Sequence, residues 1–229
     1  MKKITPIVFL LTFLSTNTFS TTLDYRHEYF DDYDSHRDRI QVAHRFGNNL
    51  GFVLETKYRS GGSKNGEAYS DLVSNGTEAE INYFYKVNNT YSLLPGLLQW
   101  SSSDYSSWRP FIRLNYKVND DLTLSARYRY EYTRYDDKSI KNDDITHRGD
   151  AWIAYSLSDT WRAEYNYVYK QSEDNNLYNN KKNDYEHNIK IDYKWSASWT
   201  PYIEAGNVSV RNSASDRQTR LRLGVKYTF

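Results

Sequence analysis

Apolar and polar residues alternate along most of the chain with a period of two, in segments of about ten residues. In one such segment the apolar positions are Leu122, Leu124, Ala126, Tyr128 and Tyr130, and the polar positions between them are Thr123, Ser125, Arg127, Arg129 and Glu131. The same alternation runs through 161–170 and 185–194. Helical spacing fits none of these segments, so they predict β-strands with one apolar face and one polar face.

Short turns and longer polar loops alternate between these segments. The short turns centre on 47–49, 88–89, 119–121, 158–159 and 196–198. The longer loops are 31–36, 60–73, 101–107, 133–144, 171–183 and 209–215. Five short turns and six long loops separate twelve strands, with both chain ends on the short-turn side. This arrangement predicts an all-β fold, a single closed antiparallel transmembrane β-barrel with short periplasmic turns and longer extracellular loops.

Aromatic side chains gather at the two ends of the predicted strands. Those near the short turns are Phe46, Tyr91, Tyr116, Trp161, Tyr193 and Trp199, and those near the long loops are Tyr29, Tyr58, Tyr132, Tyr169 and Tyr185. Two such girdles are expected where a barrel crosses the lipid headgroups. A soluble β-barrel or sandwich is the alternative, but it would bury the tyrosine-rich face. The last apolar alternation, from Leu221 to the terminal Phe229, resembles the assembly signal of outer-membrane barrels, so the barrel-assembly machinery and outer-membrane lipid are expected partners.

The composition narrows the class of protein. The mean hydropathy of −0.87 is low, yet aromatic residues make up 17% of the chain, and disordered chains lack aromatics. The chain has no cysteine, which excludes disulfides and thiolate metal sites. Its 30 basic and 29 acidic residues nearly cancel, so nothing indicates nucleic acid as a partner.

The first twenty residues predict a cleaved export signal. Lys2 and Lys3 precede an apolar stretch from Ile4 to Leu14, and Thr18-Phe19-Ser20 offers a small-x-small cleavage site. The apolar stretch is too short to span a bilayer. We therefore expect a signal peptide at 1–20 and a barrel domain at 21–229, in the outer membrane of a Gram-negative bacterium.

Basic residues on the polar strand faces are expected to form two walls across the lumen from each other. Strands 6 and 7 of the twelve carry Arg109, Arg113, Arg127 and Arg129, and strands 12, 1 and 2 carry Arg220, Arg222, Arg26 and Arg39. The turn at 118–121 places Arg113 nearly opposite Arg127. Inward acids on strands 4 and 8 to 11 are Glu78, Glu80, Asp150, Glu164, Asp192 and Glu204. Walls of arginine are a selectivity device of anion pores, and guanidinium groups bind carboxylates in two-point fashion.

A pore and an ion-paired plug are both open interpretations of such a lumen. Asp24, Glu28 and Glu131 could pair with nearby arginines and fill the barrel, as in small eight-strand barrels. Twelve strands enclose more room, which favours a pore. The long loops are acidic, with Asp31, Asp32 and Asp34 in the first of them, and this charge offsets the basic lumen.

Short motifs spread over nearly the whole chain after the signal point to one family. They are Asp24-Tyr25-Arg26-His27-Glu28, His36-Arg37-Asp38-Arg39, Ser74-Asn75-Gly76-Thr77-Glu78, Arg109-Pro110-Phe111-Ile112-Arg113, Tyr193-Lys194-Trp195, Trp199-Thr200-Pro201-Tyr202-Ile203-Glu204, Gly206-Asn207-Val208-Ser209 and Asp216-Arg217-Gln218-Thr219-Arg220. In this order they resemble the oligogalacturonate-specific porin family (KdgM-like).

The resemblance implies a monomeric twelve-strand channel that admits acidic oligosaccharides from pectin breakdown, with oligogalacturonates as the solute and no cofactor. The positions that match basic tracks along the pore are Arg26, Arg39, Arg109, Arg113, Arg127, Arg129, Arg220 and Arg222. Porins for sialic acid are a related branch, so sialic acid or another acidic sugar remains an alternative.

An enzymatic, a metal-binding or an adhesive role would each need residues that the chain supplies only in part. His27 and His44 share the lipid-facing parity that a phospholipase site would need, but no serine is well placed beside either.

His36 with Asp31, Asp32 and Asp34 could hold a divalent cation, although a solvated acidic loop explains the same residues. The loops are only modest in length for adhesion. We therefore predict a channel that is not an enzyme and has no metal site.

Overall fold

The computed structural model describes residues 20–61, 66–137 and 142–229. The predicted signal peptide therefore lies outside the described residues except for Ser20, as do parts of the predicted loops 60–73 and 133–144. The described residues contain no helix that is long and apolar enough to cross a membrane.

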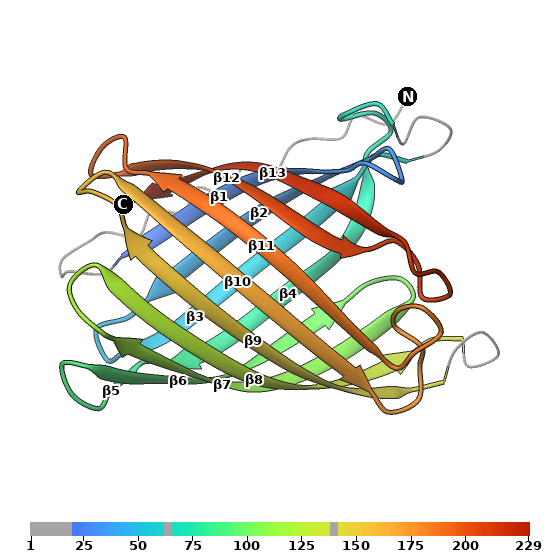
Figure 1. The fold of residues 1–229 in the computed structure, drawn as a ribbon, viewed down its shortest axis with the longest axis horizontal. Coiled ribbons are helices and arrows are strands. Elements are labelled where there is room, and N and C mark those ends of the chain that lie inside the picture. Colours follow the sequence, from blue (N-terminus) through green and yellow to red (C-terminus); the bar gives the residue numbers. More distant parts are fainter. Residues whose placement is uncertain (1–19, 62–65, 138–141) are drawn as a thin grey trace, which may run out of the picture.

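Antiparallel β-strands make up most of the described chain. They are β1 (Thr21–Phe30), β2 (Ser35–Arg45), β3 (Leu50–Arg59), β4 (Val73–Tyr83), β5 (Tyr85–Lys86), β6 (Tyr91–Ser101), β7 (Tyr105–Lys117), β8 (Leu122–Tyr135), β9 (Asp144–Ser156), β10 (Trp161–Ser172), β11 (Asn183–Tyr193), β12 (Trp199–Ser209) and β13 (Arg217–Thr228). Strands that follow each other in the sequence are paired, except that β4 pairs with β6 and the short β5 pairs with β6 alone. Because β1 also pairs with β13, the sheet closes into a barrel of tilted strands (Figure 1). The predicted closed barrel is confirmed.

The number of strands needs one correction to the expected twelve. Thirteen strands are present in the described residues because the predicted fourth strand is interrupted at Phe84. The two-residue β5 continues the pairing of β4 with β6: Asn82 pairs with Gly96, and Tyr85 pairs with Leu93 in the same register. The barrel is thus a twelve-strand barrel with one extra strand segment.

The barrel buries polar residues and exposes apolar ones. On the outer face, Leu223 is 60% exposed and Ile189 is 58% exposed, whereas the inward Asp24 and Asp150 are 5% and 3% exposed. This inversion explains the low mean hydropathy, because the interior of the barrel is built largely from polar side chains. The first and last strands also join as expected, since the backbone N–H of Phe229 donates to the Thr21 carbonyl at 2.9 Å.

One part of the inner wall is apolar, which the expectation of a polar lumen did not include. Leu98 and Trp100 on β6 and Phe111 on β7 form a buried hydrophobic cluster on the inside of the barrel. Phe111 lies against Gly96, where an added Cβ would come within 2.4 Å of the Phe111 ring. The glycine therefore lets this ring lie flat on the wall instead of projecting into the lumen.

Candidate functional site

Arg113 on β7 is the least neutralised of the predicted wall arginines. Its Cα is paired with that of Arg127 on β8, as the turn at 118–121 predicts. Its Nε donates to Asn115 Oδ1 at 2.9 Å, and its guanidinium carbon lies 4.3 Å from the ring centre of Trp152. No carboxylate of the described residues lies within 4.0 Å of its nitrogens. An amide and an aromatic ring thus hold this side chain and leave its charge uncompensated by any short ion pair.

The other arginines on β7 and β8 share a small number of carboxylates. Arg127 Nε donates to Asp150 at 3.1 Å, and Arg129 Nε donates to Glu131 at 2.6 Å. Arg109 reaches Glu131 only at 3.9 Å, and its Nε donates to a serine hydroxyl. We call Arg109, Arg113, Arg127 and Arg129 the β7–β8 wall.

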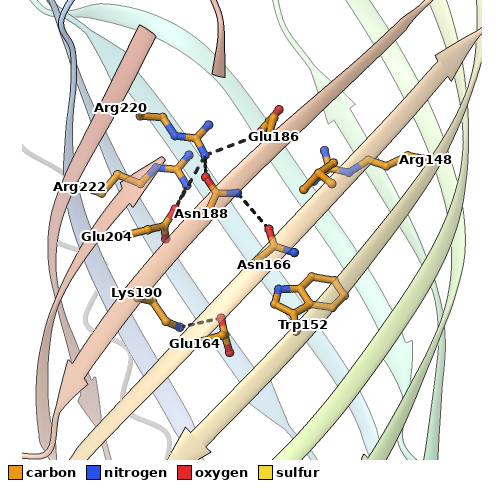
Figure 2. A pocket seen from close by; sticks show the side chains of 11 residues that line it. Arg148, Trp152, Glu164, Asn166, Glu186, Asn188, Lys190, Glu204, Arg220 and Arg222 are labelled. Atoms are coloured by element: carbon orange, nitrogen blue, oxygen red, sulfur yellow. Dashed lines mark hydrogen bonds and ion pairs between the residues drawn. The ribbon is translucent and has the colours of Figure 1, made fainter. Parts of the chain in front are cut away.

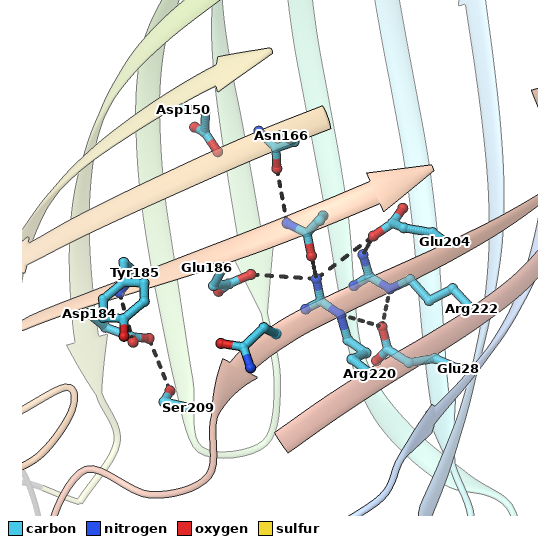
Figure 3. A network of polar contacts seen from close by, with 12 residues as sticks. Glu28, Asp150, Asn166, Asp184, Tyr185, Glu186, Glu204, Ser209, Arg220 and Arg222 are labelled. Carbon is cyan, nitrogen blue, oxygen red and sulfur yellow. Dashed lines mark hydrogen bonds and ion pairs between the residues drawn. The ribbon is translucent and has the colours of Figure 1, made fainter. Parts of the chain in front are cut away.

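Two arginines of the wall on β13, β1 and β2 are each held by two carboxylates. Arg222 donates to Glu204 at 2.5 Å and to Glu28, so it connects two carboxylates from neighbouring strands (Figure 3). Arg39 in the same way donates to Asp24 at 2.6 Å and to Glu55 at 3.1 Å. We call Arg26, Arg39, Arg220 and Arg222 the β13–β1–β2 wall.

Two members of this wall have weaker or mixed partners. Arg220 donates to Asn188 at 2.7 Å and lies 3.5 Å from Glu186, and Figure 2 shows both contacts. Arg26 lies 3.9 Å from Glu28. The four arginine side chains are between 10% and 15% exposed, so they are largely shielded from solvent.

The strand register explains why Arg222 is paired. The register partners across β10, β11, β12, β13, β1 and β2 form one row of alternating charge, Glu164, Lys190, Glu204, Arg222, Glu28 and Arg37. Opposite charges on directly opposed positions stabilise a strand pair, and this row gives Arg222 a carboxylate on each side. Each wall also contains one pair of directly opposed like charges, Arg113 with Arg127 on one wall and Arg26 with Arg39 on the other. The register therefore accounts for the pairing of Arg222 in particular.

The lumen is not solidly filled. A hollow of about 240 Å³ is lined by Trp152, Asn166, Asn188, Arg148 and Arg220, among others (Figure 2). A second hollow of about 360 Å³ is lined by residues of β1, β2, β3 and β6, and Arg220 and Arg222 border both of these hollows. A third hollow of about 710 Å³ lies at the extracellular ends of β7 to β10, and Arg148 borders it and the first. The interior thus combines the ion pairs expected of a plug with the open volume expected of a pore.

All eight predicted arginines point inward, but the sequence reasoning missed other lumen residues. Arg148 donates to Asp150 at 2.7 and 3.0 Å, and Lys190 lies between Glu164 and Asp192 at 3.3 and 3.4 Å. The strands between the walls therefore carry basic residues beside the acids expected there. The alternation could have identified Arg148, because it has the parity of Asp150. The alternation could not predict the contact between the Trp152 ring and the Arg113 guanidinium, because this contact joins β7 to β9, which are not neighbouring strands.

The histidine clusters lie on the lipid-facing side of the barrel. His27 bonds to Asp38 through Nδ1 at 2.9 Å and to His36 through Nε2 at 3.0 Å. His44 bonds to the hydroxyl of Thr21 at 2.7 Å. Among the described residues, no group of three or more His, Cys, Asp or Glu side chains is arranged to hold a metal ion, and this includes His36 with its neighbouring loop acids.

Comparison with known proteins places the chain in one family. A model of the oligogalacturonate-specific porin protein family (KdgM) matches residues 14–229. The chain is 35% identical over 224 residues to the oligogalacturonate-specific porin KdgM of Dickeya dadantii (strain 3937), covering 94% of each. It is 27% identical over 217 residues to the N-acetylneuraminic acid outer membrane channel protein NanC of Escherichia coli (strain K12), covering 90% of each.

Solved structures agree with this placement. The KdgM porin, alone and in complex with disordered oligogalacturonate, matches with a TM-score of 0.69 and 35% identity, over 91% of this chain and 99% of that one. The closed barrel and these matches together show that the chain belongs to the oligogalacturonate-specific porin (KdgM) family and is a porin of the bacterial outer membrane.

Proposed function

We propose that this porin lets acidic oligosaccharides, and oligogalacturonates above all, diffuse into the periplasm, with Arg26, Arg39, Arg109, Arg113, Arg127, Arg129, Arg220 and Arg222 binding the passing carboxylates. The observation that carries the proposal is Arg113, an inward guanidinium without a short ion pair. A guanidinium held in place but not neutralised keeps its two-point geometry available for a carboxylate of the solute.

The spacing of charge supports an oligomeric solute. Each galacturonate unit carries one carboxylate, so a chain in the lumen presents regularly spaced negative charges to both walls. Arg113 and Arg127 lie on one wall, and Arg220 and Arg222 lie across from them. Successive carboxylates can exchange one guanidinium for the next, and conduction requires that no single contact holds the solute strongly.

The test is a planar-bilayer recording of the purified protein. Under a salt gradient the reversal potential should show anion preference, and added trigalacturonate should block the current in a concentration-dependent way. Cation preference would mean that the inward carboxylates control the field, and it would overturn the proposal. Absence of block by trigalacturonate with anion preference retained would remove the sugar from the proposal and leave a general anion pore.

Sialic acid is the second candidate solute, because NanC, an N-acetylneuraminic acid channel by name, is a relative at lower identity. The two solutes differ in the number of charges on a chain. N-acetylneuraminate has one carboxylate, whereas trigalacturonate has three. Stronger block by N-acetylneuraminate than by trigalacturonate would favour this second candidate.

Further parts of the proposal concern export and assembly. We propose that residues 1–20 are removed as a signal peptide, that Phe229 at the end of the closing strand serves the barrel-assembly machinery, and that the barrel is a monomer in outer-membrane lipid. We also propose that the protein is not an enzyme, since the residues bonded to His27 are Asp38 and His36 and not a serine. N-terminal sequencing of the mature protein tests the cleavage site directly.

A further inference from the structure

A row of uncharged residues crosses the inner surface of the barrel from β6 to β12. Its members are register partners on successive strands, namely Ser92, Asn115, Ser125, Trp152, Asn166, Asn188 and Gly206. We call these seven residues the neutral row. The rows on either side carry charges, with Arg113, Arg127 and Asp150 on one side and Glu164, Lys190 and Glu204 on the other. The seven uncharged positions therefore form a strip that lies between two charged rows of the inner wall.

Side-chain hydrogen bonds connect the neutral row at both ends. Near one end, Asn115 donates to Ser92 at 3.2 Å and accepts from Ser125 at 2.8 Å. Near the other end, Asn188 donates to Asn166 at 3.1 Å, as Figure 2 shows. These contacts fix the amide groups in defined orientations.

Each end of the row is joined to a wall arginine. Arg113 donates to Asn115 at 2.9 Å and lies over the ring of Trp152, and Arg220 donates to Asn188 at 2.7 Å. A guanidinium of the β7–β8 wall and one of the β13–β1–β2 wall thus lie at opposite ends of an uncharged strip. A solute carboxylate bound at either arginine would place the body of the solute over that strip.

The middle of the row borders a hollow of suitable size and chemistry. Trp152, Asn166 and Asn188 line the hollow of about 240 Å³, together with four basic side chains, among them Arg220, and three glutamates (Figure 2). Gly206 adds no side chain, and an added Cβ there would come within 2.4 Å of Asn188 Oδ1. This volume is that of roughly eight water molecules at about 30 Å³ each, which is room for one sugar ring.

We propose that the neutral row is a sugar-binding subsite, in which amide side chains bind the hydroxyl groups of one uronate unit and Trp152 contacts the ring of that unit. The inference rests on the proposed function and deepens it, because the uncharged part of the sugar is bound by residues other than the arginines. An amide both donates and accepts hydrogen bonds, as a hydroxyl does. A site built to bond hydroxyl groups discriminates against solutes that lack them, whereas arginines bind any carboxylate.

The experiment compares two blockers of equal charge, trigalacturonate and tricarballylate, a tricarboxylate without sugar rings. Asn166→Ala removes an amide that contacts no arginine directly, and it should weaken block by trigalacturonate between about two- and tenfold, the range of one neutral hydrogen bond. Block by tricarballylate and the reversal potential should stay unchanged. Trp152→Leu should weaken the sugar block as well, while Trp152→Phe, which keeps an aromatic face, should retain most of it.

Matched controls lie on the lipid side of the neighbouring strands. Asn207→Ala on β12 and Trp161→Leu on β10 should leave both blocks as in the wild type, because Asn207 bonds to Arg217 and Trp161 is 45% exposed on the outer face. Equal loss of both blocks in Asn166→Ala, or unchanged sugar block in Asn166→Ala and Trp152→Leu, would overturn the subsite. Wild-type protein that tricarballylate blocks and trigalacturonate does not would instead overturn the proposed function, and the subsite with it.

Discussion

The two basic walls have the same number of predicted arginines but very different surroundings. On the β13–β1–β2 wall, Arg222 is held between Glu28 and Glu204, and Arg39 is held between two further carboxylates. On the β7–β8 wall, Arg113 is held by Asn115 and Trp152 and has no carboxylate within ion-pair distance in the described chain. The number of arginines on a wall therefore does not predict where positive charge remains unneutralised in the pore.

The difference separates two tasks that arginine performs. A guanidinium between two shielded carboxylates stabilises the barrel interior, because either carboxylate alone would be costly to bury. A guanidinium on an aromatic ring is positioned by cation–π attraction, which leaves its field largely uncancelled. We infer that the β13–β1–β2 wall contributes mainly to stability and the β7–β8 wall mainly to anion attraction.

The largest expected effect is on stability. Arg222→Met should lower the free energy of unfolding by about 3 kcal/mol, because Glu28 and Glu204 then lose their shortest cationic contact in a shielded site. Arg113→Met should cost much less, since it leaves no carboxylate unpaired. Urea unfolding in lipid vesicles, followed by tryptophan fluorescence, measures both changes.

A double replacement sharpens this prediction. Adding Glu28→Gln to Arg222→Met should recover part of the lost stability, because it removes one uncompensated charge. If Arg113→Met proves as destabilising as Arg222→Met, the assignment of stability to the β13–β1–β2 wall is wrong.

The next effect concerns ion selectivity. Arg113→Ala combined with Arg127→Ala should weaken anion binding in the lumen by about 2 kcal/mol, at about 1 kcal/mol for each charged contact. The barrel should still assemble, because Asp150 keeps both of its contacts with Arg148. Reversal potentials under a potassium chloride gradient give the selectivity, and an unheated band that migrates faster than the boiled one reports the folded barrel.

The combination of Arg220→Ala and Arg222→Ala removes the same number of charges from the other wall. When Glu28→Gln and Glu204→Gln accompany this change, we expect a smaller loss of anion preference than from the β7–β8 pair, because the net charge of the wall is then unchanged. An equal loss from the β7–β8 pair and from this charge-neutral set would show that compensation by neighbouring carboxylates does not matter for selectivity.

The sequence predicted the fold well because the alternation of side chains is a direct consequence of strand geometry. The turn at 118–121 even predicted that Arg113 and Arg127 oppose each other, since register across a tight turn is a local property. The break at Phe84 was not predicted, because the residues on either side of it keep one register and one alternation.

The surroundings of the site were less predictable. Parity shows that Arg222 and Glu28 both point inward, and the predicted closure makes their strands neighbours. Pairing them requires the register of β1 against β13, which no turn fixes because these strands come from opposite ends of the chain. The contact between Arg113 and Trp152 crosses from β7 to β9 and depends on side-chain conformation. Contacts of this kind decide which arginines stay available, and no short sequence pattern encodes them.

A smaller effect should follow from a single change. Arg113→Ala alone should weaken block by trigalacturonate by about 1 kcal/mol, or somewhat more, the range for a hydrogen bond to a charged group. Arg39→Gln, on the compensated wall, should weaken it less. Single-channel recordings at several blocker concentrations give both values. A larger loss in Arg39→Gln would reverse the comparison between the walls.

The smallest effect tests the geometry of the free arginine. Arg113→Lys keeps one positive charge, so the reversal potential should remain close to that of the wild type. Lysine is a point charge without the planar fork, so it cannot bind a carboxylate at two points or bond to Asn115 in the same way. We expect block by trigalacturonate to weaken by about 0.5 kcal/mol, which is less than for Arg113→Ala. The difference between the two variants measures the part of the binding energy that the positive charge alone supplies. Measuring block at two salt concentrations separates the contributions, because screening weakens the charge effect more than the short hydrogen bonds. If Arg113→Lys matches the wild type at both salt concentrations, the β7–β8 wall acts through charge alone and the planar guanidinium is not required there.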